Sequence, residues 1–183
     1  MKKIFFVLAI CTCFILIYNG VFLDKLVTDH KEKEASITKK INTVLDQWHK
    51  AATNAEFENY FSKMDSLSIF IGTDASENWT RNQFKKFSKP YFDNGKAWDF
   101  KTLERNIHIS KNKDVVWFDE LLNTWMGTCR GSGVLENDSK NDSWKIKHYV
   151  LSVSIPNENI QQIIKLKKEK DSLFLQKIKK LPK

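Results

Sequence analysis

The second half of the chain alternates apolar and polar residues, and this feature constrains the fold most. Segments 100–109, 115–126 and 144–152 each repeat with a period of two, which is typical of strands with one buried face. Polar segments at 111–114 and 137–142 separate them. The pattern predicts an antiparallel meander whose strands are joined by short turns.

The first half repeats its apolar residues at spacings of three and four instead. The clearest series is Ile37, Ile41, Val44, Leu45 and Trp48. It predicts a helix to about residue 52, with one face packed on the sheet. Similar patterns predict two more helices near 57–64 and 80–90, with a strand at 67–71 between the two. Helices followed by strands are typical of an α+β domain.

Two neighbouring strands carry a family resemblance. Residues 124–134 read TWMGTCRGSGV and residues 144–152 read WKIKHYVLS. Together with Gly72-Thr73-Asp74 and Trp79, they resemble the SnoaL-like branch of the nuclear transport factor 2-like superfamily. The resemblance covers about residues 44–158. It implies an α+β cone, in which a curved antiparallel sheet and three N-terminal helices enclose a pocket.

The N-terminal residues 1–23 read as a membrane segment. Lys2 and Lys3 precede the uncharged run 4–18, which suits either a spanning helix or the core of a signal peptide. Because no Ala-x-Ala cleavage pattern follows, we expect an uncleaved anchor that holds the domain on the extracytoplasmic side. A secreted form or a lipoprotein processed at Cys11 is the alternative. Residues 24–36 are expected to form a linker to the domain at 37–156.

The C-terminal residues 157–183 carry most of the basic charge. Eight Lys stand there against Glu158, Glu169 and Asp171, a net charge of +5 out of +8 for the whole chain. The apolar residues of this tail predict a basic amphipathic helix, which can lie on an anionic membrane, dock on a partner or cap the domain. Nucleic acid is not expected as a partner, because aromatic residues do not interleave with the lysines.

Strand alternation places candidate site residues on the concave side of the sheet. His148 follows Ile146 by two and is therefore expected beside it, as a general base, a ligand donor or a hydrogen-bonded core residue. Asp119 and Glu120 must point to opposite faces. We predict that Glu120 enters the pocket and pairs with Arg130, either as part of a binding site or as a structural ion pair.

Five further residues complete the set of candidates for the ligand pocket. They are Tyr60, Asp74, Trp79, Trp98 and Trp125. Aromatic residues at such spacings are also ordinary core residues, and a carboxylate after Gly72 is also typical of a turn. The histidines and cysteines lack metal-ligand spacing, so no metal or cofactor is predicted.

These observations favour a membrane-tethered domain that binds a small, mainly apolar molecule or a protein partner in its cone, without catalysis. The SnoaL-like resemblance also implies an alternative, an isomerase or cyclase in which a pocket His or carboxylate transfers a proton. No catalytic set of those enzymes matches this chain residue by residue. A homodimer formed through the exposed sheet face is a further expectation that rests on the fold alone.

Overall fold

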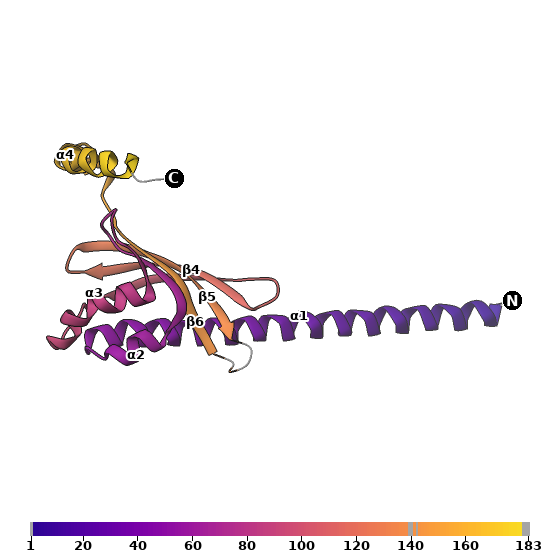
Figure 1. Ribbon diagram of the computed structural model, residues 1–183. Coiled ribbons are helices and arrows are strands. Elements are labelled where there is room, and N and C mark those ends of the chain that lie inside the picture. Colours follow the sequence, from indigo (N-terminus) through magenta and orange to yellow (C-terminus); the bar gives the residue numbers. More distant parts are fainter. Residues whose placement is uncertain (1, 139–140, 142, 181–183) are drawn as a thin grey trace.

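The computed structural model describes residues 2–138, 141 and 143–180, with side chains from Val27 onwards. A curved sheet forms one layer, and helices α1, α2 and α3 lie on its concave side (Figure 1). The prediction of an α+β domain with three helices before the main strands is confirmed.

Helix α1 runs from Lys2 to Thr53 without interruption. Its C-terminal part packs on the sheet through the predicted face, with Ile41 and Leu45 fully buried. Residues 24–36, which were expected to form a linker, continue helix α1. They contain no Gly or Pro and are rich in Lys and Glu, which are good helix formers.

The predicted membrane segment, 1–23, lies before the first residue whose side chain is described. From Val27 onwards, no helix of the described chain is long and apolar enough to span a membrane. Figure 1 shows α1 leaving the sheet as a single rod, with the N-terminus at its far end.

Helices α2 (Phe57–Ser62) and α3 (Arg81–Asp93) close the concave side. Thr80 caps α3, because its side chain accepts from the backbone N–H of Gln83 while the Gln83 side chain accepts from the backbone N–H of Thr80. The chain turns after α3 at Gly95, whose φ of +85° is a conformation that glycine adopts without strain.

Six strands form the sheet, in the order β2-β1-β6-β5-β4-β3. Their bounds are β1 Met64–Ile71, β2 Asn78–Thr80, β3 Lys101–Ile109, β4 Val115–Thr124, β5 Gly127–Asp138 and β6 Ser143–Val153. Strands β3 to β6 form the predicted antiparallel meander. The expectation of a fully antiparallel sheet is wrong, because β1 pairs with β6 in parallel. Alternation within a strand does not reveal the direction of a partner about 80 residues away.

Aromatic side chains fill much of the concave side. Phe70 stacks on Phe84 with ring centroids 3.9 Å apart, and Trp98 contacts Tyr60 and Phe92 at 5.4 Å each. Offset and edge-to-face ring contacts of this kind stabilise a core beyond the area they bury. The region predicted to be an open pocket is therefore largely a packed aromatic core.

The C-terminal tail forms a turn, η1 (Asn157–Asn159), and helix α4 (Ile160–Lys179). Helix α4 stands apart from the sheet and from α1 to α3 (Figure 1).

Candidate functional site

A buried carboxylate lies at the centre of the concave face. Glu120 on β4 has no exposed surface, and three side chains donate hydrogen bonds to it. His49 Nε2 lies 2.8 Å and the Tyr149 hydroxyl 3.1 Å from its Oε1. Arg105 donates to Oε2 through Nε at 3.0 Å and Nη2 at 2.9 Å. We call these four residues the Glu120 cluster.

The Glu120 cluster joins four elements, namely α1, β3, β4 and β6. His49 follows Leu45 by four residues and so shares the buried face of α1. Arg105 on β3 is the direct cross-strand neighbour of Glu120 on β4, and Tyr149 comes from β6. The cluster therefore fastens α1 to three strands of the sheet.

The surroundings of Glu120 keep it ionised. Burial by itself raises the pKa of a carboxyl group, but the hydrogen bond and charge of His49 and of Arg105 outweigh burial and hold the pKa of Glu120 below its ordinary value of 4.5. Burial, and then the charge of Glu120, raises the pKa of Tyr149 well above its ordinary value, so this hydroxyl stays protonated and donates. Both carboxylate oxygens are occupied by donors, which suits bracing better than proton transfer.

Gly131 leaves the space that this cluster needs. A Cβ atom at this position would run into the hydroxyl of Tyr149 and lie 3.0 Å from Cγ of Glu120. Gly133, two residues along the same face of β5, leaves similar room for the ring of Phe118. The two glycines thus let large side chains of β4 and β6 meet across β5.

The predicted position of His148 on the concave side is wrong. The pairing of β6 with β5 shifts by one residue between Ile146 and His148, because Val134 faces His148 while Leu135 faces Ile146. One extra residue in a strand reverses the faces of all residues after it. Tyr149 therefore takes the buried position, and His148 lies half-buried on the other face.

The predicted ion pair of Glu120 with Arg130 does not form. Arg130 follows the buried Cys129 on β5 and so points to the opposite face. There its Nη1 lies 3.5 Å from Oδ2 of Asp119 in an exposed pair. Arg105, on the other strand next to β4, forms the buried ion pair with Glu120 that was predicted for Arg130.

Three other candidate pocket residues make contacts that are typical of a structural role. Tyr60 is buried and stacks on Trp48 at 4.9 Å. Trp79 stacks on Phe87 at 4.5 Å. Asp74 accepts from the backbone N–H of Ser76 at 2.8 Å, which is the turn role that its position after Gly72 allowed.

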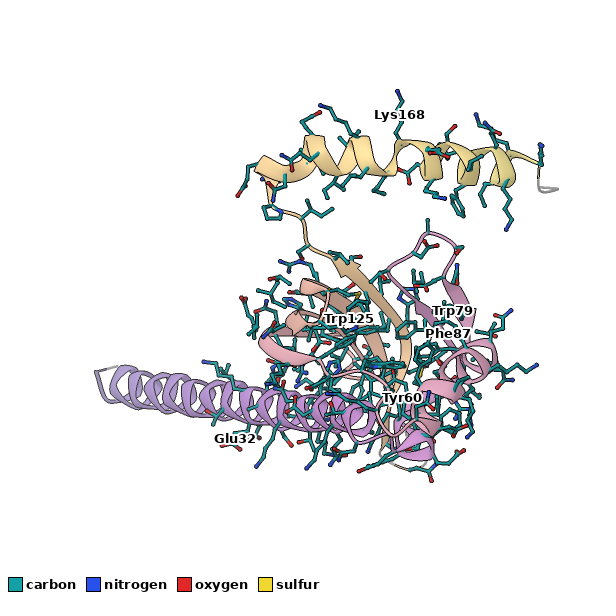
Figure 2. All side chains as sticks on the ribbon, turned by 90° about the vertical axis from the view of Figure 1, so that its left-hand side faces the viewer. Glu32, Tyr60, Trp79, Phe87, Trp125 and Lys168 are labelled. Atoms are coloured by element: carbon teal, nitrogen blue, oxygen red, sulfur yellow. The ribbon has the colours of Figure 1, made fainter. Side chains whose placement is uncertain are left out.

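The last two candidates, Trp98 and Trp125, line a hollow of about 410 Å³ beside the turn between β4 and β5. Its lining is Lys96, Ala97, Trp98, Asp99, Lys101, Asn123, Thr124 and Trp125. Trp98 joins this hollow to the aromatic core through its contact with Tyr60. Trp125, labelled in Figure 2, is 81% exposed at the turn between β4 and β5. We call this the mouth hollow.

The charges around the mouth hollow are unequal. Lys96 lies 3.8 Å from Asp99, a weak pair. Within the described part of the chain, Lys101 has no carboxylate within ion-pair distance. The hollow therefore presents two aromatic surfaces beside a net positive charge.

Sequence reasoning missed His49, Arg105 and Tyr149. A signal was present for His49, which continues the series Ile41 and Leu45 at a spacing of four. Arg105 could be identified only from the register of β3 against β4. Tyr149 could be identified only from the bulge in β6.

Comparison with solved structures supports the fold. A protein of unknown function from Pseudomonas putida, described as nuclear transport factor 2-like, is 10% identical with a TM-score of 0.55, over 69% of this chain and 92% of that one. A candidate dehydratase of the same fold family from Streptomyces avermitilis is also 10% identical, with a TM-score of 0.57 over 67% and 99%.

A candidate ketosteroid isomerase from Parabacteroides distasonis is 12% identical, with a TM-score of 0.51 over 63% of this chain and 86% of that one. At such identities the likeness concerns the fold alone. No curated protein matches the chain. The SnoaL-like domain family matches residues 41–156, which is more than half of the sequence. The chain therefore belongs to the SnoaL-like family, as its strand sequences and fold indicate.

Proposed function

We propose that this domain binds a small molecule with an aromatic or flat apolar part and a negative charge, and that it does so at the mouth hollow without catalysis. The observation that carries the proposal is the pairing of Trp98 and Trp125 with Lys101 around one hollow. Binding sites are typically concave, mostly apolar and equipped with a few polar groups that fix orientation.

The walls of the mouth hollow support a preformed site. Trp98 is held by ring contacts with Tyr60 and Phe92. Thr124 is also fixed, because its hydroxyl donates to the carbonyl of Gly127 at 2.9 Å. A rigid wall lowers the entropy that a ligand must lose on binding.

An isomerase or dehydratase is the second candidate, and one observation favours it. His49 and Glu120 form a close pair of titratable groups, and solved proteins of this fold are described as a candidate ketosteroid isomerase and a candidate dehydratase. Against this candidate, the carboxylate of Glu120 is fully buried and saturated with donors. A general base must reach the proton it removes.

The mouth hollow can be tested with the fluorescent probe 1-anilinonaphthalene-8-sulfonate, which is both aromatic and anionic. We expect Trp125→Ala to weaken binding of the probe about tenfold, because stacking on an aromatic ring is worth about 1–3 kcal/mol. Lys101→Gln should weaken it by up to about fivefold, because an exposed ion contact is worth about 0–1 kcal/mol. Trp117→Ala is the matched control, since Trp117 is 48% exposed nearer the start of β4 and does not line the hollow. Equal losses in Trp117→Ala and Trp125→Ala would count against the mouth hollow.

The proposal includes a membrane anchor at the N-terminus. Its support is the uncharged run 4–18 after Lys2 and Lys3. We expect the full-length protein to fractionate with membranes, and its mature mass to include residue 1. A soluble product that begins near residue 21 would contradict the anchor.

Removal of residues 1–29 should leave a folded, soluble domain. From Val27 onwards, where side chains are described, the first buried residue is Ile37, so residues 27–29 contribute no buried side chain to the core. We expect one cooperative thermal transition. Aggregation, or melting without cooperativity, would show that the N-terminal part of α1 stabilises the domain.

A further inference from the structure

Helix α4 carries an apolar stripe that the described parts of the chain leave uncovered. The stripe consists of Ile160, Ile163, Ile164, Phe174, Leu175 and Ile178, which fall on one side of a helix with 3.6 residues per turn. Four of its side chains are between 41% and 56% exposed, namely Ile160, Ile164, Leu175 and Ile178. Among the described elements, α4 contacts mainly the turn η1 that directly precedes it, and Figure 2 shows the helix apart from the domain.

The stripe borders a shallow hollow of about 560 Å³ along the helix. Ile155, from the segment before η1, adds an apolar side chain to it. Lys168 and Lys179 stand at its edge, and Figure 2 shows Lys168 pointing away from the domain. The surface thus combines an apolar floor with cationic edges.

The net charge of α4 indicates which kind of partner this surface can bind. The helix contains six Lys against Glu169 and Asp171, a net charge of +4. Lys167 and Asp171 lie within the stripe and pair at 3.5 Å, so their charges offset each other. A second copy of α4 would bring two such positive faces together, which is unfavourable. A negatively charged surface complements both the stripe and its lysines.

We infer that α4 binds the surface of an anionic phospholipid bilayer. The stripe enters the boundary between headgroups and acyl chains, while the flanking lysines contact the negatively charged headgroups. A helix of 20 residues with this charge lies in the plane of the membrane and does not cross it. Because α4 and the N-terminus lie at opposite ends of the molecule (Figure 1), this contact is separate from the proposed anchor.

The test is hydrogen exchange of the full-length chain, reconstituted in vesicles and read by peptide mass spectrometry. On vesicles that contain phosphatidylglycerol, the amides of 160–179 should exchange about tenfold more slowly than on pure phosphatidylcholine vesicles. Because the readout is local to α4, attachment through the N-terminus does not affect it. Raised salt should remove the difference, since it screens charges at a surface.

Two double variants distinguish binding through the apolar stripe from a general effect of hydrophobic side chains on α4. Ile164→Gln with Leu175→Gln should abolish the protection, whereas Leu166→Gln with Leu173→Gln, which lie off the stripe, should retain it. Gln has a helix propensity close to that of Leu, so the helix itself is preserved. Equal exchange on both kinds of vesicle would overturn the inference. So would protection without lipid that rises with protein concentration, which would indicate docking on a second copy.

Discussion

Glu120→Ala is expected to lower the free energy of unfolding by about 3–5 kcal/mol, because it removes the fully buried carboxylate that accepts from Nε and Nη2 of Arg105, while Nη1 keeps its pair with Asp46 at 2.8 Å. His49 and Tyr149 lose their acceptor at the same time. The measurement is urea unfolding of the chain that begins at residue 30. Total stabilities of about 5–15 kcal/mol are usual for domains, so the loss is large.

Asp119→Ala is the matched control for this substitution. It removes the neighbouring carboxylate on the same strand, whose pair with Arg130 is exposed. Exposed pairs contribute about 0–1 kcal/mol. If the two substitutions cost the same, the Glu120 cluster does not brace the fold.

The same cluster should make stability depend on pH. The folded pKa of Glu120 lies below its ordinary value of 4.5, so the unfolded chain binds this proton more readily. The stability that ionised Glu120 contributes to the folded state is fully present above about pH 4.5, and it is lost as the pH falls through the pKa of Glu120 in the folded state. The difference in unfolding free energy between the native chain and Glu120→Gln should therefore shrink on acidification. A constant difference would contradict an ionised, stabilising Glu120.

Gly131→Ala and Gly133→Ala should each cost about 1–3 kcal/mol, the usual effect of overfilling a packed core. At Gly133 the added methyl group would lie 2.5 Å from the carbonyl oxygen of His148, which is backbone and cannot rotate away. Unfolding of Ser132→Ala is the control, because Ser132 lies between the glycines on the other face of β5. A loss below 0.5 kcal/mol in both glycine variants, which is the scale of ordinary surface substitutions, would show that the strands can separate to admit a side chain.

Features set by neighbouring residues were predictable from the sequence. The start of α3 at Thr80 follows from capping chemistry within four residues. The burial of Glu120 follows from alternation along an unbroken strand, β4. In both cases the physical cause lies within one element.

Features set by pairing were not predictable. One extra residue in β6 exchanged His148 for Tyr149 at the concave face, and no residue type in that segment marks a bulge. Arg105 and Arg130 were equally plausible partners for Glu120 by charge. Arg105 is the partner because its side chain lies on the same face of the sheet as Glu120 and directly opposite it in the register of β3 against β4.

The aromatic residues predicted to line the pocket fall into two groups. Trp98 and Trp125 meet at the mouth hollow, whereas Tyr60 and Trp79 pack in the aromatic core and its edge. Periodicity identifies an apolar face but does not distinguish a filled interior from an open cavity. That distinction depends on the summed volume of side chains from several elements.

The most direct test of binding at the mouth hollow is the indole N–H spectrum of the six Trp residues in the chain, recorded while 1-anilinonaphthalene-8-sulfonate is added. We predict that the signals of Trp98 and Trp125 shift together and saturate, while those of Trp48 and Trp117 stay in place. A shift of Trp48 would mean that the ligand enters the aromatic core beside Glu120. A shift of Trp117 without Trp98 would place binding on the outer face of the sheet, and either result would contradict the proposed site.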